Sequence, residues 1–238
     1  MNANTALNHY GKGFRDGIPI GIGYLSVSFT FGIMAVNSGL PVWLAVLISM
    51  TNLTSAGQFA GVNLICCQVP YIEMALTHMI INMRYALMSV SLSQKTDKSF
   101  NLLHRFLISF GITDEVFAVA SGKESDIGIK YMYGLISAPY LGWTTGTLLG
   151  AAASTILPEV VSSALNIAIY GMFIAIIIPP AKHSKPVLKV ILISVAISCL
   201  INYIPLLAFL SGGFAIIICA VAASALGAVL QPVKEAGQ

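Results

Sequence analysis

The sequence predicts an all-α polytopic integral membrane protein. Apolar residues fill 57% of the 238 positions and charged residues only 9%, whereas an ordinary soluble domain has about 25% charged residues. The mean hydropathy of +0.85 applies to the whole chain, so the apolar character is not confined to one anchor. A soluble domain tethered by a single helix is therefore excluded, and we expect a multi-pass protein surrounded by a lipid bilayer.

About eight apolar segments have the length of a membrane span, because a hydrocarbon core of about 30 Å requires about 20 apolar residues per helix. They cover residues 17–37, 41–67, 69–93, 103–122, 129–154, 159–180, 186–210 and 212–230. The first follows Lys12 and Arg15 as in a signal peptide, but it is too long and has no clear cleavage site, so we expect a retained span. The polar connectors are too short for a soluble domain, and residues 1–238 are predicted to form one transmembrane domain.

The second segment is interrupted by the polar sequence Thr-Asn-Leu-Thr-Ser-Ala-Gly-Gln at residues 51–58. Lipid does not tolerate exposed irregular backbone, so we predict that Asn52 to Gln58 is non-helical and lines a cavity inside the protein. Unwound helices of this kind bind polar substrates in transporters. Hydrogen bonding between helices is the alternative role for these side chains.

Two topologies compete for the chain. If all eight segments cross the membrane from a cytoplasmic N-terminus, the basic residues between 95 and 105 lie outside. If the second and sixth segments are instead broken and re-entrant, only Lys123 and Lys130 lie outside. Basic loops resist translocation, and the re-entrant topology is favoured by one residue. It predicts that the loop from Gln94 to His104 is cytoplasmic.

A weak internal repeat fits the re-entrant topology. Three elements of the N-terminal half recur in the C-terminal half at a nearly constant offset: Tyr24-Leu25, Gly32 and Leu40-Pro41 correspond to Tyr140-Leu141, Gly150 and Leu157-Pro158. The repeats would cover about residues 12–93 and 129–210, in opposite orientations, as in many secondary transporters. Chance remains the alternative, since Leu, Gly and Pro are common in membrane helices.

Ionisable side chains at membrane depth cost about 2.5 to 3.5 kcal/mol each and are candidates for function. Arg84 lies in the third segment, and Asp114 and Glu115 lie in the fourth. These segments are neighbours along the chain, so we expect an ion pair between Arg84 and one carboxylate. Successive helical residues point about 100° apart, so only one carboxylate should meet Arg84. A structural salt bridge and a direct part in substrate or proton handling are both open.

Glycines at positions 142, 146 and 150 repeat the GxxxG spacing, which allows a second helix to approach closely. The spacing does not tell whether that helix is internal or belongs to another subunit.

Several classes of function are not expected. The net charge of +3 is not concentrated in a basic patch, so a nucleic-acid partner is not predicted. The four cysteines lack the spacing of a metal or redox site, so no metal and no cofactor are predicted. No HExxH motif, GxSxG motif with a positioned histidine, or nucleotide-binding loop occurs, so we do not expect an enzyme.

Four stretches of the chain resemble the AzlC family, the large subunits of bacterial branched-chain amino-acid exporters. They are Gly17 to Tyr24 continuing to Phe31-Gly32, Ala56 to Ala60, Asn82-Met-Arg84, and Thr113-Asp-Glu115. Tyr85 stands where a histidine often follows the Asn-x-Arg element of the family, and the chain departs from the family pattern at that position.

The resemblance implies a secondary transporter that exports leucine, isoleucine, valine and methionine across the inner membrane, driven by an ion gradient. It also implies a small AzlD-like membrane subunit as partner. A hydrophobic amino acid needs polar partners for its charged groups and an apolar pocket. The expected substrate-binding or coupling residues are Asn52, Gln58, Asn82, Arg84, Asp114 and Glu115. A permease or channel for another small polar solute and a non-transporting membrane subunit remain alternatives.

Overall fold

The computed structural model describes residues 7–154, 156, 174, 177–178, 181–182, 184–204 and 212–230. In this part of the chain the regular structure is helical and no strand is present, which confirms the all-α prediction there. The chain divides into two compact units, which are treated separately below. The first contains residues 1–59 and 82–169, and the second contains residues 60–81 and 170–238.

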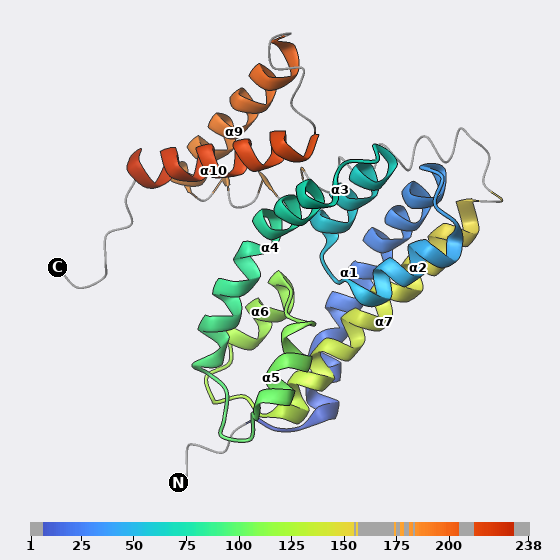
Figure 1. The fold of residues 1–238 in the computed structure, drawn as a ribbon. Coiled ribbons are helices and arrows are strands. Elements are labelled where there is room, and N and C mark those ends of the chain that lie inside the picture. Colours follow the sequence, from blue (N-terminus) through green and yellow to red (C-terminus); the bar gives the residue numbers. More distant parts are fainter. Residues whose placement is uncertain are drawn as a thin grey trace. The chain divides into compact units, whose positions relative to one another are not determined.

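The helices are α1 (Tyr10–Asn37), α2 (Val42–Thr51), α3 (Ser55–Cys66), α4 (Tyr71–Ser93), α5 (Leu102–Ser109), α6 (Asp114–Ser121), α7 (Ile129–Ser154), α9 (Lys185–Tyr203) and α10 (Gly212–Leu230) (Figure 1). Among the described residues, 2 helices, α1 and α9, are long and apolar enough to cross a membrane. The predicted count of about eight spans is therefore not confirmed. The sixth predicted segment, 159–180, lies almost wholly outside the described residues.

Helices α1 and α7 pack against each other along glycines (Figure 1). A Cβ atom on Gly21 would lie 2.7 Å from the carbonyl oxygen of Ala138, and a Cβ atom on Gly142 would collide with the backbone of Gly21. Cβ atoms on Gly146 and Gly150 would also collide with the backbone of α1. The helix that approaches the GxxxG spacing is thus internal, which answers the question that the sequence left open.

The second predicted segment is broken, but over a shorter stretch than predicted. Helix α2 ends at Thr51 and α3 begins at Ser55, so only residues 52–54 are non-helical. The prediction that the irregular stretch extends to Gln58 is wrong. Thr54 explains the difference, because its Oγ1 accepts a hydrogen bond from the Gly57 amide at 3.3 Å and caps the first turn of α3.

The fourth predicted segment, 103–122, is broken as well, and this break was not predicted from the sequence. Helix α5 ends at Ser109 and α6 begins at Asp114. Thr113 caps α6 by accepting a hydrogen bond from the Val116 amide at 3.4 Å, and two acidic residues follow in the first turn. A threonine cap followed by acidic residues is typical of a helix start, so the signal was present in the sequence.

Helices α5 and α6 form a hairpin. The start of α5 and the finish of α6 lie together at one end of the first unit. There Lys95 Nζ donates to the Lys123 carbonyl at 2.5 Å, and the Leu7 amide donates to the Asp126 carbonyl at 2.8 Å. We call this place the loop end; it consists of residues 7–9, 94–101 and 122–128. Both predicted topologies placed residues 94–101 and 122–128 on opposite sides of the membrane. This is wrong, because the fourth predicted segment is broken and turns back instead of crossing.

Helix α2 and the start of α3, up to Phe59, form a second hairpin, which enters from the other end of the unit. The amide of Leu40, just before α2, donates to the Ala35 carbonyl at 3.1 Å, so α2 starts where α1 finishes. After the break, Phe59 of α3 packs against Phe31, in the last part of α1, with ring centroids 5.4 Å apart. The two helix breaks are therefore approached from opposite ends of the unit.

In the second unit, α9 packs against α10, where a Cβ atom on Gly227 would lie 2.5 Å from Val190. Glu73 and Thr77 of α4 are buried there and lie next to Gly213. The predicted repeat over 12–93 and 129–210 stays a prediction, because part of its second copy lies outside the described residues. The single transmembrane domain also stays a prediction.

Candidate functional site

The two helix breaks meet at an open pocket of about 210 Å³ in the first unit. Its walls come from the α2–α3 break, from α4 and from the α5–α6 break. The lining residues are Thr51, Asn52, Leu53, Thr54, Asn82, Tyr85, Ser109, Phe110 and Ile112. Hydroxyl and amide groups thus share the pocket with Leu53, Phe110 and Ile112, which fits a ligand with both polar and apolar parts.

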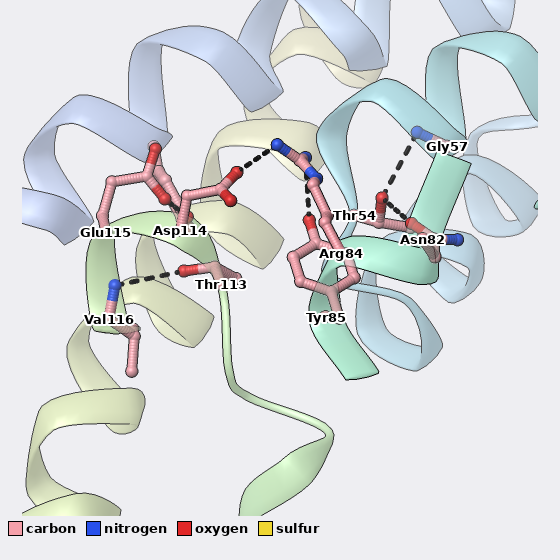
Figure 2. Close-up of polar contacts among 10 residues, drawn as sticks. Thr54, Gly57, Asn82, Arg84, Tyr85, Thr113, Asp114, Glu115 and Val116 are labelled. Carbon is pink, nitrogen blue, oxygen red and sulfur yellow. Dashed lines mark hydrogen bonds and ion pairs between the residues drawn. The ribbon is translucent and has the colours of Figure 1, made fainter. Parts of the chain in front are cut away.

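Side-chain hydrogen bonds hold the first break in place. Asn52 Oδ1 accepts from the Thr54 amide at 3.2 Å. Thr54 Oγ1 donates to Asn82 Oδ1 at 2.7 Å and fastens the break to α4 (Figure 2). Asn52 and Asn82 were predicted as site residues from different apolar segments, and the structure brings both to this pocket.

Arg84 follows Asn82 by two positions and forms an ion pair across to the second break (Figure 2). Its Nη1 lies 2.6 Å from Asp114 Oδ2, with both side chains 45% exposed. Its Nη2 donates to the Tyr85 hydroxyl at 3.3 Å, and its Cζ lies 5.0 Å from the centre of that ring. The predicted pair between Arg84 and one carboxylate is confirmed. Through Tyr85, this pair borders the pocket.

Asp114 and Glu115 occupy the first turn of α6, where the partial positive charge of a helix N-terminus stabilises carboxylates. They point to different partners, as predicted for adjacent helical residues. Asp114 pairs with Arg84, whereas Glu115 Oε2 accepts a hydrogen bond from the Tyr24 hydroxyl of α1. The Tyr24 ring in turn packs edge-on against Trp143, with centroids 5.3 Å apart.

Gln58 lies in a buried network and does not line the pocket. Its side chain is 1% exposed, its Nε2 donates to Ser49 Oγ at 3.0 Å, and its Oε1 accepts from Trp143 Nε1 at 2.7 Å. Ser49 also shares a hydrogen bond of 2.7 Å with Thr147. In this arrangement Gln58 joins α3 to α2 and α7, which matches the alternative role predicted for it.

Two residues that shape this site were not predicted from the sequence, Thr54 and Tyr24. Thr54 lay inside the irregular stretch, but its cap of α3 and its bond to Asn82 were not predicted. Tyr24 contacts Glu115 although the two are 91 positions apart, and no sequence spacing connects them. The threonine could have been found as a helix cap; the tyrosine contact depends on the packing of α1 beside α6.

The family model described as AzlC protein matches residues 19–157, a range that contains the whole pocket and the ion pair. The chain belongs to the AzlC family. It is 31% identical over 173 residues to an uncharacterized membrane protein of Archaeoglobus fulgidus, covering 72% of this chain and 75% of the relative. It is 26% identical over 181 residues to the inner membrane protein YgaZ of Escherichia coli, covering 73% and 74% of the two chains.

A third relative of this AzlC-family protein is an uncharacterized membrane protein of Helicobacter pylori. The two are 24% identical over 153 residues, which cover 61% of this chain and 66% of the relative. No solved structure matches the chain. The family and the names of its relatives agree with the composition, so this is a membrane protein of the AzlC family.

Proposed function

We propose that this AzlC-family protein is a secondary transporter that exports leucine, isoleucine, valine and methionine across the inner membrane. The observation that carries the proposal is the Arg84–Asp114 ion pair, which borders a pocket formed between two helix breaks. Ionisable residues at membrane depth are rare and mark substrate or ion pathways, and the substrate sites of transporters are typically formed where helices are broken.

The pocket offers a partner for each part of a hydrophobic amino acid. The Arg84 guanidinium suits the carboxylate, because its planar set of donors matches two carboxylate oxygens. The oxygens of Asn52 and Thr54 suit the ammonium group. Phe110 and Ile112 provide an apolar wall for the branched side chain. A bound carboxylate would compete with Asp114 for Arg84, so occupancy of the pocket would change the ion pair.

The arrangement of the hairpins suits alternating access. One hairpin reaches the pocket from the loop end and the other from the opposite end of the first unit. A movement of either hairpin would open the pocket to one side while the other hairpin closes it. Coupling to a proton gradient would follow if Asp114 releases Arg84 when it takes up a proton and pairs with it again when it loses the proton.

The surface of α5 is suited to a membrane environment. Leu102, Leu103 and Phe106 are 84%, 62% and 74% exposed, which is unfavourable in water and favourable against lipid or another membrane helix. We propose multi-pass insertion in the inner membrane and association with a small AzlD-like membrane subunit.

The decisive experiment is efflux from cells preloaded with labelled leucine, isoleucine, valine or methionine. We expect faster efflux in cells that express this protein with the small subunit than in cells with neither, and loss of the difference when the proton gradient is collapsed. Unlabelled leucine should compete. Export of an unrelated polar solute without such competition would instead indicate a permease or channel, and equal efflux in all cells would indicate a non-transporting subunit.

A further inference from the structure

A second pocket, of about 180 Å³, lies in the first unit beside the α5–α6 hairpin. Its interior is apolar, and five of its lining side chains are nearly or fully buried: Leu92, Phe100, Ile108, Ile112 and Met132, at 3%, 9%, 3%, 7% and 0% exposure. Its remaining lining residues are polar or basic: Ser89, Ser93, Thr96, Arg105 and Ser109. Thr96 and Phe100 belong to the loop end, so the pocket lies next to that end.

The two pockets share part of their lining. Ser109, the last residue of α5, and Ile112, in the break that follows, line both the apolar pocket and the polar pocket described above. The two pockets are therefore adjacent at the α5–α6 break. Ile112 is 7% exposed and contributes to the walls of both pockets.

We infer that the apolar pocket is an entry vestibule for the hydrophobic amino acid, in which Arg105 binds the carboxylate and Ile112 is the barrier to the polar pocket. The inference rests on the proposed function and adds to it a second binding position and the route by which substrate arrives from the loop end.

Arg105 is the charged group available for this role. Among the described residues its side chain forms no ion pair and no hydrogen bond. Two other basic residues near the loop end are already engaged: Lys95 donates to the Lys123 carbonyl, and Lys123 Nζ lies 2.7 Å from Asp16. A guanidinium without a partner beside an apolar pocket suits a ligand with one carboxylate and one aliphatic chain.

The vestibule differs from the polar pocket in what it can recognise. No carboxylate or amide side chain is among its lining residues, so it offers no strong partner for an ammonium group. It should therefore bind the carboxylate and the aliphatic part of leucine and leave the amine hydrated. The amine would find its partners only beyond Ile112, where Asn52 and Asn82 line the polar pocket.

This difference gives a specific probe. The deaminated analogue of leucine, 4-methylpentanoate, keeps the carboxylate and the branched chain and lacks the amine. It should occupy the vestibule from the loop end and inhibit leucine export competitively. Arg105→Gln should weaken inhibition about tenfold, because a hydrogen bond between charged groups is lost, and should raise the KM for leucine by a similar factor with little change in the maximal rate.

Lys98→Gln is the matched control, since Lys98 lies in the loop end just before α5, its replacement also removes one positive charge, and it does not line the pocket. Full-length protein would be reconstituted with its small subunit in vesicles, and leucine would be added on the side of the loop end. A second measurement does not depend on transport. In a variant without native cysteines, Ser109→Cys should react with a water-soluble thiol reagent, and 4-methylpentanoate should slow the reaction unless Arg105 is also replaced.

The inference is overturned if leucine is exported but Arg105→Gln and Lys98→Gln change its KM equally, or if 4-methylpentanoate fails to protect Ser109→Cys. If the parent protein exports no leucine while protection is seen and depends on Arg105, the vestibule stands as a carboxylate site and the proposed substrate is wrong. Absence of both export and protection overturns both proposals.

Discussion

Lys95 Nζ donates a hydrogen bond to the carbonyl oxygen of Lys123 at 2.5 Å and joins the loop after α4 to the loop after α6. The helices between these loops, α5 and α6, therefore leave and return at one end of the first unit. As a result, the basic residues in or near the loop end gather on one side: Lys12, Arg15, Lys95, Lys98, Arg105, Lys123 and Lys130. Basic residues are retained in the cytoplasm.

The first prediction follows from this clustering. Single cysteines at Lys98 and Glu124, in a variant without native cysteines, should both be protected from a membrane-impermeant thiol reagent in intact cells and should both react after the membrane is opened. The straight eight-span topology and the earlier re-entrant topology each require one of the two positions to react in intact cells. Labelling of either position alone would therefore contradict the hairpin formed by α5 and α6.

The second prediction concerns the contact between α1 and α7. Gly150→Leu should lower the thermal unfolding temperature of the detergent-purified protein, because a Cβ atom at this position would collide with the Phe29 carbonyl. Overpacking costs about 1 to 3 kcal/mol in well-packed interiors. Gly23→Leu is the matched control, since nothing lies within 4 Å of a Cβ atom there, and it should leave the temperature unchanged or raise it. Equal effects of the two substitutions would contradict the close packing.

The third prediction separates packing from substrate contact at Gln58. Gln58→Leu should destabilise the protein by about 1 to 3 kcal/mol, because it leaves the buried Trp143 Nε1 without its acceptor. The double variant Gln58→Leu with Trp143→Phe should lose less stability than the sum of the losses in the two single variants, since neither polar group then remains unpaired. Thermal unfolding in detergent measures both effects. A variant Gln58→Leu with parent stability and no leucine efflux would show that the amide serves the substrate instead.

Composition and local polarity predicted much of this fold. The apolar segments 69–93, 129–154 and 212–230 correspond closely to α4, α7 and α10, because long apolar runs in a membrane have few alternatives to a helix. The α2–α3 break was predicted because polar residues concentrate there. The α5–α6 break was missed because residues 110–113 contain few polar side chains, and the helix start at Thr113 was read as the middle of a span.

The site was predicted in part for a similar reason. The cost of isolated charges in hydrocarbon identified Arg84 and the acidic pair, and the short loop between their segments predicted that they meet. Which carboxylate meets Arg84 depends on the direction of α6, and this is fixed by the turn at residues 110–113. Contacts such as Tyr24 with Glu115 arise from the packing of distant helices, so no local pattern reports them.

The last prediction tests the ion pair between Arg84 and Asp114. Removing one partner leaves the other charge without compensation, which is more costly than removing both. Arg84→Gln alone should therefore lower the yield of folded protein, and Arg84→Gln with Asp114→Asn should restore the yield. The double variant should still export leucine at least about tenfold more slowly than the parent, because a loss of 1.4 kcal/mol in substrate binding already corresponds to a factor of ten.

Glu115 supplies the matched control for this experiment, since it neighbours Asp114 but is hydrogen-bonded to Tyr24 and not to Arg84. Arg84→Gln with Glu115→Gln also removes one positive and one negative charge but leaves Asp114 unpaired, so it should not restore the yield. Yield is measured by size-exclusion chromatography of the detergent extract, and export by efflux of labelled leucine. If Arg84→Gln alone is well folded and exports leucine at the parent rate, the ion pair is peripheral to transport. Equal recovery in both double variants would show that only net charge matters and that the contact with Asp114 has no specific role.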